Sequence, residues 1–248
     1  MNSRTKTFTL AAMITAATIA GIVANGQLAS AGGGGPNNTN GIKFNKKNFS
    51  DPLNIDNKYF PLKPGTTFFY VGTKEGEPQS DELIVTDRTK EVDGITARVV
   101  RDNAYENGKL VEFTDDWYAQ DDNGNVWYMG EFTNEVENGK VVSNEGSWEA
   151  GVKGAKPGIF MEANPKVGDT YQQEFSKGIA EDRAEIVSLT DSVCVPYGCF
   201  NNVLETRETT PIEPGVEEHK FFAPGVGDIK EQLFSGGSEI LELTKITT

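Results

Sequence analysis

Histidine and cysteine are scarce in this chain of 248 residues, which has one His and two Cys. One histidine excludes a multi-histidine metal site, and a Ser-His-acid triad would have to use it. This residue, His219, lies in the run Glu217 to Lys220, and the chain has no Gly-x-Ser-x-Gly elbow. We therefore interpret His219 as an ordinary surface residue and not as a catalytic one.

Basic residues are also few, because 23 Lys and Arg face 37 Asp and Glu, which gives a net charge of −14. Such a surface repels nucleic acid and anionic lipid and favours solubility. The chain has no Walker loop, no Rossmann glycine pattern and no basic-aromatic stripe. We expect no nucleic-acid partner and no cofactor, and we interpret the acidic excess as a solvated surface coat.

Long apolar runs are missing except at the start, where Leu10 to Val23 follows Arg4 and Lys6. The run is too short and too rich in Ala, Thr and Gly for a comfortable span of ~20 residues. Ala29-Ser30-Ala31 behind it is typical of a signal peptide that is cleaved before Gly32. We therefore expect an extracytoplasmic protein, whether periplasmic, cell-surface or secreted, with no transmembrane segment after cleavage. Its 21 basic and 37 acidic residues would then give a net charge of −16.

Residues 1–31 are the predicted signal peptide. The rest of the chain has the length of one β-rich domain. Residues 32–43 are rich in Gly and Asn, and we expect them to form a disordered leader. Residues 44–248 form the predicted single β domain. Its first part is expected to be an irregular segment that Phe49, Tyr59 and Phe60 clip onto the body.

Strong helix signals are lacking, because no long segment keeps a 3.6-residue apolar period without a Gly or Pro. Short strand-like segments recur roughly every 8–12 residues, separated by pairs such as Asp93-Gly94, Asn107-Gly108 and Asn138-Gly139 that are typical of tight hairpins. The pattern weakens between Glu149 and Pro165, which we predict to be a loop or crossover. We predict a mainly β fold: a single antiparallel meander that forms a curled half-barrel or barrel-like sheet with little helix.

The two cysteines, Cys194 and Cys199, enclose Val195-Pro196-Tyr197-Gly198. Outside the cytoplasm a close pair is most simply a disulfide, and the Pro and Gly between them favour a chain reversal. A metal site would need further ligands nearby, and this segment has none. We predict a structural disulfide that stabilises the fold modestly, because the loop it closes is short.

Aromatic and acidic residues concentrate between residues 113 and 148, where all three Trp of the chain lie. One hypothesis places them on a concave ligand-binding face, and the alternative places the Trp rings in the core, where they bury a large area. Carboxylates such as Asp116, Glu131 or Glu145 would also suit a glycan hydrolase if their separation were right. The candidate ligand-binding residues are Trp117, Tyr118, Trp127, Tyr128, Trp148, Asp116 and Glu131.

The segment Asp121 to Asn125 has oxygen ligands that resemble part of a calcium loop. It lacks the spacing of an EF-hand and its distal Glu, and it lies where a hairpin turn is needed. We interpret it as a turn, and the sequence predicts no metal site.

A sequence motif near the C-terminus resembles the pattern V-P-x-G-x-F … Y-A-x-G-V-G-x-V-K of a group of secreted bacterial β-proteins. It is carried by Val195 to Phe200 and by Phe221 to Gly227, and Tyr59 to Thr66 resembles the strand opening of the same group. That group is distantly similar to lipoprotein-carrier half-barrels of the LolA/LolB type. The resemblance implies a half-barrel fold, and it carries over no catalytic residue. Cys199 stands where the pattern often has Ser or Thr.

Three functions remain open. The first is an exported, non-enzymatic binding or carrier protein that holds a small or lipophilic ligand, or a cell-surface component, on a concave aromatic-rich face. The second is an extracytoplasmic, carboxylate-dependent glycan hydrolase, and the third is a structural envelope protein. We favour the first because of the half-barrel resemblance and the concentration of aromatic residues.

Overall fold

The fold is built almost entirely from β-strands. The structure is a computed structural model that describes residues 40–248, so the predicted signal peptide and residues 32–39 of the leader lie outside the described residues. A short 3-10 helix, η1 (Lys46–Asn48), comes first among the described elements, and all the elements after it are strands. This confirms the prediction of a mainly β fold. The strands are β1 (Thr67–Lys74), β2 (Glu77–Val92), β3 (Ile95–Glu106), β4 (Lys109–Gln120), β5 (Val126–Glu137), β6 (Lys140–Ser143), β7 (Trp148–Glu149), β8 (Lys156–Met161), β9 (Thr170–Gln172), β10 (Glu174–Phe175), β11 (Arg183–Val195), β12 (Gly198–Thr209), β13 (Glu217–Ala223), β14 (Gly227–Ser235) and β15 (Glu239–Thr247).

The strands form one antiparallel sheet in the order β10-β8-β5-β4-β3-β2-β1-β15-β14-β13-β12-β11-β9, with β6 and β7 paired to β5. Neighbours in the sheet are mostly neighbours in sequence, as a meander requires. The predicted turns Asp93-Gly94, Asn107-Gly108 and Asn138-Gly139 have positive φ at both residues. That conformation matches the right-handed twist of the flanking strands and explains the tight hairpins.

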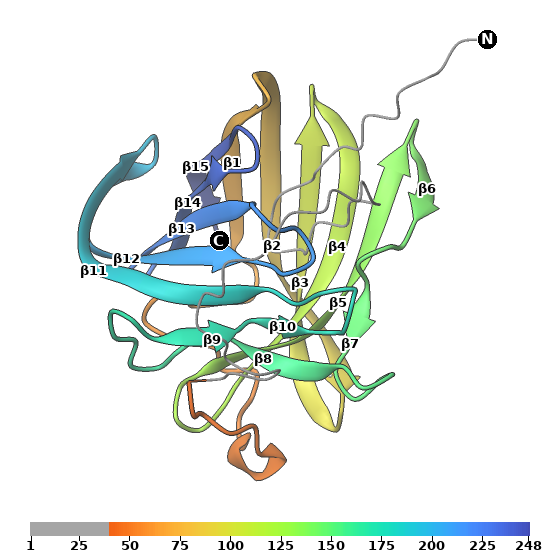
Figure 1. Cartoon of the computed structure of the whole chain (residues 1–248), viewed down its shortest axis with the longest axis vertical. Helices are drawn as coiled ribbons and strands as arrows, with labels where there is room; N and C mark the ends of the chain where they lie inside the picture. Colours follow the sequence, from red (N-terminus) through yellow and green to blue (C-terminus); the bar gives the residue numbers. More distant parts are fainter. Residues whose placement is uncertain (1–39) are drawn as a thin grey trace.

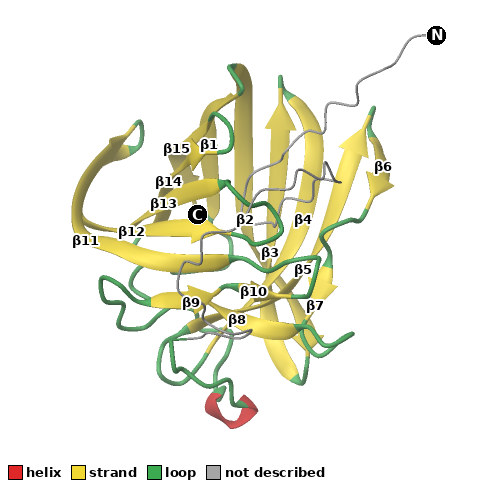
Figure 2. Ribbon diagram, viewed as in Figure 1, coloured by secondary structure: helices red, strands yellow, loops and turns green. Residues whose placement is uncertain are grey.

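The sheet curls into a nearly closed barrel (Figures 1 and 2). In Figure 1, β2 to β5 run along the long axis while β8 to β12 run across it, as a strongly twisted sheet requires. The closing segment is the bent pair β9 and β10, since β9 pairs with β11 and β10 pairs with β8. At this seam Gly158 is necessary, because a Cβ there would lie 2.1 Å from the carbonyl oxygen of Gln173.

One part of the strand prediction was wrong. Residues Glu149 to Pro165 were expected to form a loop or crossover, but β8 runs from Lys156 to Met161 inside that range. The segment reads as irregular because Pro157 and Gly158 are poor strand formers. Gly158 is there because of the close approach of the chain across the seam.

The interior has an aromatic part and an acidic part. Phe60 packs against Phe160, Tyr118 and Phe222, with ring centroids 4.2, 5.3 and 6.4 Å away. This cluster fills the barrel near the first irregular segment, whose Phe49, Tyr59 and Phe60 pack onto the body as predicted. Elsewhere, the inward positions of β2, β3, β4, β5 and β14 carry buried carboxyl groups.

The first described residues belong to the folded part. Asn40, within the range expected to be leader, donates a hydrogen bond from Nδ2 to Glu162 Oε1 at 3.0 Å. Ile42 packs against the core, and the ring of Phe44 meets that of Trp127 at 5.1 Å.

The predicted disulfide between Cys194 and Cys199 is present in the hairpin that joins β11 to β12, where the two residues are register partners. The backbone N–H of Tyr197 in this turn donates to the carbonyl oxygen of Leu243 at 3.0 Å, so the hairpin tip is also held by β15.

We expect the double variant Cys194→Ser/Cys199→Ser to lose about 2 kcal/mol of stability or less, since chain-entropy loss scales with the size of the closed loop. Thermal melts with and without reductant check this. The wild-type Tm should fall by a few degrees on reduction, and the double variant should not respond. A loss large enough to unfold the domain would contradict a merely local role for the disulfide.

Candidate functional site

All seven predicted ligand-binding residues are buried, and six of them gather in one region. Trp117, Tyr118 and Asp116 come from β4, while Tyr128 and Glu131 come from β5. Trp148 opens β7, directly opposite Glu131 in register. Because their side chains are buried, these residues contribute to the core.

Trp127 lies apart from this group. Its Nε1 donates to Asp121 Oδ2 at 3.0 Å, and its ring packs against Phe44 and Phe49. Asp121 also accepts hydrogen bonds from the backbone N–H groups of Asn123 and Asn125. The segment from Asp121 to Asn125 is therefore the turn that the sequence predicts. Within residues 40–248, no group of three or more His, Cys, Asp or Glu could hold a metal ion.

Two buried carboxyl groups share one tyrosine hydroxyl. The Tyr128 hydroxyl lies 2.5 Å from Asp116 Oδ1 and 2.9 Å from Glu131 Oε2. A hydroxyl donates a single proton, so one of these contacts needs a proton from the carboxyl side. Burial raises the pKa of both acids well above the usual range, and the charge of Asp102 adds to the rise at Asp116, as that of Glu174 does at Glu131.

This arrangement does not suit a glycosidase. Asp116 is fully buried and Glu131 is 1% exposed. Glycoside hydrolysis needs a sugar between its two carboxyl groups, and here a tyrosine hydroxyl occupies that position. Glu145, the third candidate carboxylate, is exposed in the turn before β7.

A bulge at Gly130 brings these residues together. The β4–β5 register shifts between Trp117 and Tyr118, so Tyr128 and Glu131, three residues apart, both face Asp116. Gly130 has φ 132°, and a Cβ there would lie 2.4 Å from the carbonyl oxygen of Trp148 and 3.1 Å from the Trp117 ring. Only glycine lets β7 approach β5 this closely.

Beside the bulge is a hollow of about 200 Å³, here called the aromatic pocket, and three predicted residues line it. Its walls include Trp117, Trp148, Phe132, Val152 and Ile179, and Glu131 forms part of its lining. Glu131 Oε1 and Trp148 Nε1 are both buried and have no hydrogen-bond partner among the described residues. Of the seven predicted residues, only Trp117, Trp148 and Glu131 line this hollow, and its second wall comes from Val152 and Ile179, which the sequence did not suggest.

The sequence analysis did not predict that many acidic side chains lie in the interior of the barrel. Asp81 and Asp102 are both buried, and burial raises the pKa of both acids, that of Asp102 to about 6. Lys220, also interior, lies 3.5 Å from Glu208 and 3.6 Å from Glu218. Burial lowers the pKa of Lys220 while the surrounding carboxylates raise it, and the carboxylates prevail. A signal in the sequence could have revealed these residues, because they occupy the same face of a strand as aliphatic residues. Asp81, for example, stands two residues before Leu83 and four before Val85, and all three are buried.

The interpretation of His219 as an ordinary surface residue was wrong. Its side chain is on the outer face of β13, but the residue is only 9% exposed. The ring stacks on Phe234 with centroids 4.0 Å apart, and its nitrogens lie 2.6 Å from Glu205 and 3.2 Å from Glu217. Among the described residues, the ring and hydrogen-bond partners given for His219 are Phe234, Glu205 and Glu217, and none of these carries a hydroxyl or thiol nucleophile.

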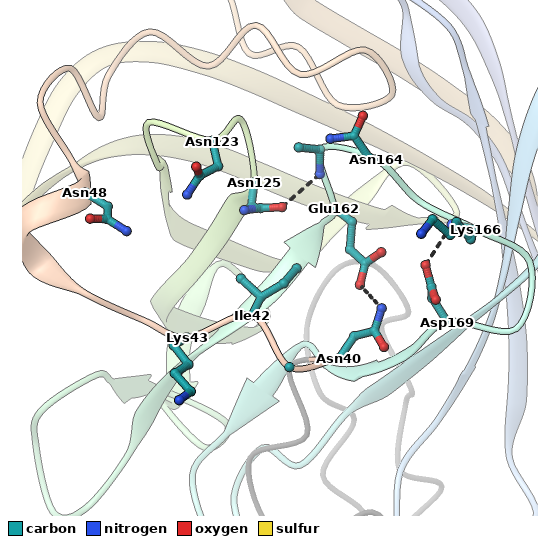
Figure 3. A pocket seen from close by; sticks show the side chains of 12 residues that line it. Asn40, Ile42, Lys43, Asn48, Asn123, Asn125, Glu162, Asn164, Lys166 and Asp169 are labelled. Carbon is teal, nitrogen blue, oxygen red and sulfur yellow. Dashed lines mark hydrogen bonds between the residues drawn. The ribbon is translucent and has the colours of Figure 1, made fainter.

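A second, larger hollow of about 590 Å³ lies where the first irregular segment meets the 121–125 turn and residues 162–169 (Figure 3). Its main polar groups already bond to one another. Asn125 Oδ1 accepts from the backbone N–H of Ala163 at 2.9 Å, Glu162 Oε1 accepts from Asn40, and Asp169 Oδ2 accepts from the N–H of Lys166 at 2.8 Å. This hollow therefore presents fewer unsatisfied groups than the aromatic pocket.

Comparison with known proteins gives only remote likenesses. No protein-family model and no curated protein matches the chain. A solved structure from Bacteroides fragilis, described as that of an exported protein with a YmcC-like fold, aligns with a TM-score of 0.46 at 15% identity over 77% of this chain and 100% of that one. A Parabacteroides distasonis protein described as a lipoprotein aligns with a TM-score of 0.42 at 12% identity over 77% of this chain and 99% of that one. Neither likeness carries an argument about function.

Among residues 40–248, no helix is long and apolar enough to cross a bilayer.

Proposed function

We propose that this chain is an exported, non-enzymatic binding protein that holds a small ligand in the aromatic pocket. The observation that carries the proposal is the hollow itself, a space of about 200 Å³ whose lining includes Trp117, Phe132 and Trp148 and whose rim opens to solvent at Phe132 and Val152, each 47% exposed. Small-molecule sites are typically concave and lined mostly by aromatic and apolar side chains with a few polar groups, as this hollow is. The signal-like N-terminus and the disulfide support export.

A binding role fits these residues better than hydrolysis does. The two acids of the region face each other through Tyr128 and not across an open cleft. The catalytic alternative would need a second free carboxyl group at the aromatic pocket, and Glu149, which also lines it, lies 3.0 Å from Lys90 in an ion pair.

The test is native mass spectrometry of protein taken from its own producing cells, on the wild type and on a Val152→Trp variant. Val152 is 47% exposed at the pocket, so a Trp there should obstruct the hollow without disturbing the core. A bound mass present in the wild type and lost from Val152→Trp supports the proposal. Val142→Trp, at a similarly exposed valine on β6 outside the pocket, is the matched control and should keep the bound mass. A bound mass that survives in Val152→Trp would place the ligand elsewhere and overturn the proposal.

A further inference from the structure

The strand β10, which closes the barrel, carries a buried acid. Glu174 is the first residue of β10, is 2% exposed and has its Oε2 buried without a hydrogen-bond partner among the described residues. Burial raises the pKa of Glu174 well above its usual range, and the charges of Asp182 and Asp116 add to the rise. In the closed barrel Glu174 therefore keeps its proton at a pH where an exposed glutamate has lost it.

The charged groups that act on Glu174 come from five other parts of the fold. They are Asp182 before β11, Asp116 on β4, Glu131 on β5, Glu208 on β12 and Lys220 on β13. The hydroxyls of Tyr118 and Tyr128 are further titratable groups near this carboxyl. Because four of the five charged groups are carboxyl groups, ionising Glu174 in the closed barrel would add a negative charge to surroundings that are already acidic.

The ionisable residues of the two flanking strands lie on the other face of the seam. On β8, Lys156 Nζ lies 5.5 Å from the centroid of the ring of Phe175, the residue that follows the buried glutamate and points to the opposite side of the strand. On β11, Arg183 is exposed and Glu185 is half-buried, and both alternate with the buried Ala184. The acid of the seam therefore faces inward, toward the interior carboxyl groups.

The seam itself is short. It consists of β9, with three residues, and β10, with two, and it lies between β11 and β8 (Figure 1). Its bend is held by Gln173, whose Nε2 donates to Glu208 Oε1 at 3.0 Å and whose backbone N–H donates to the carbonyl oxygen of Asp182 at 2.8 Å. A segment with so few ladder bonds opens at a lower free energy than the long central strands.

Opening the seam releases a proton. Once Glu174 reaches solvent, its pKa returns to the usual value of 4.5, whereas the closed seam holds the proton to a higher pH. Between these two pKa values, the release of one proton raises the ratio of open to closed seam by about tenfold per pH unit. Rising pH therefore favours the open seam, and falling pH favours the closed one.

We propose that the seam of β9 and β10 is a pH-dependent latch, closed while Glu174 holds its proton and released as rising pH removes it. Release separates β9 from β11 and gives solvent a path into the acidic interior of the barrel. The latch is a different part of the molecule from the aromatic pocket, and it does not depend on the ligand proposed there.

The test measures how fast a buried thiol beside the seam reacts with a water-soluble thiol reagent. Ala184 is 2% exposed and stands opposite Tyr171 of β9 in register, so Ala184→Cys places a reporter at the seam. Ala97→Cys, at a fully buried alanine on β3, reports opening elsewhere. The two native cysteines are both in the disulfide and do not compete. Each rate is divided by that of an unfolded peptide with the same cysteine at the same pH, which removes the pH dependence of the thiolate.

We expect the normalised rate of Ala184→Cys to rise between pH 5 and pH 7, and Glu174→Gln to remove about tenfold per pH unit from that rise. Glutamine keeps the shape of the side chain and is neutral at every pH. Asp81→Asn, at an interior acid that is 1% exposed on β2, is the matched control and should leave the response of the seam unchanged. The Ala97→Cys reporter should react more slowly than Ala184→Cys at every pH.

Three outcomes would overturn the latch. One is an equal pH response of Ala184→Cys with and without Glu174. The second is a response that Asp81→Asn flattens as much as Glu174→Gln does, which would assign the effect to the interior acids as a whole. The third is an Ala97→Cys reporter that reacts as fast as Ala184→Cys, which would mean that the whole domain unfolds. This last comparison needs no change at Glu174, so it decides the matter even where Glu174→Gln does not fold.

Discussion

A Gly130→Ala variant should lose at least ~3 kcal/mol of stability, because overpacking against a backbone atom cannot be relieved by side-chain rotation. The new Cβ would lie 2.4 Å from the carbonyl oxygen of Trp148, 2.9 Å from the Cα of Glu149 and 3.1 Å from the Trp117 ring. Either β7 moves away from β5, or the bulge that aligns Tyr128 and Glu131 with Asp116 is lost. Both responses dismantle the aromatic pocket.

Chemical denaturation followed by tryptophan fluorescence measures this loss, since Trp117 and Trp148 border the substitution. Gly139→Ala is the matched control. Gly139 also has a positive φ, of 73°, but a Cβ there would meet no atom within 4 Å. Gly139→Ala should therefore lower the free energy of unfolding only by the cost of placing alanine at a positive φ, about 1 kcal/mol. Equal losses in the two variants would show that backbone conformation, and not the approach of β7, makes glycine necessary at 130.

The second large effect is on pH dependence, and we expect the free energy of unfolding to fall by at least ~3 kcal/mol between pH 5 and pH 8. Burial raises the pKa of Asp102 from 3.8 to about 6 and that of Glu239 from 4.5 to about 7. Burial also raises the pKa of Asp81, Asp116 and Glu131 well above the usual range.

The sign follows from proton uptake. Between the unfolded pKa values near 4 and the raised values of the folded state, the native protein holds protons that the unfolded chain has released. Raising the pH through this window therefore destabilises the fold. At lower pH the trend reverses at Asp115, where burial opposes the shift but hydrogen bonds from Arg88 and Arg101 prevail and lower the pKa. Its contribution is lost as that carboxylate is protonated.

Urea denaturation at pH 5, 6, 7 and 8 tests the prediction. Asp102→Asn, which is neutral at every pH, should show a shallower decline than the wild type. Asp87→Asn, an exposed acid on the same sheet, is the charge-matched control and should follow the wild-type slope. A wild-type stability that is flat or rises from pH 5 to pH 8 would mean that the interior acids are already ionised at pH 5.

Local signals made the hairpins predictable. Pairs such as Asn107-Gly108 adopt the positive φ values that their turn type requires, and nothing distant alters them. The interruption expected around Pro157 and Gly158 was a seam and not a loop, because the need for glycine arises from Gln173 in another strand. A contact between residues of two different strands leaves no mark on the local sequence pattern.

The interior acids escaped prediction for a related reason. A carboxylate in a strand is normally assigned to the solvent side, yet Asp81, Asp102 and Asp116 occupy inward positions on three adjacent strands. The sequence grouped all three tryptophans as candidate ligand contacts, because they are close together in the chain. In the structure Trp117 and Trp148 line the aromatic pocket, whereas Trp127 packs against Phe44 and belongs to the turn at Asp121.

The seam of the barrel has a consequence for how the molecule opens. Three register pairs join β9 to β11 and two join β10 to β8, whereas β2 and β3 share eleven. Local opening free energies follow the number of bonds and contacts that must break. The seam amides should therefore exchange with solvent deuterium well before those of β2 and β3. Each such opening would bring water to Glu174, the one acid of the interior network that is carried by the seam strands themselves.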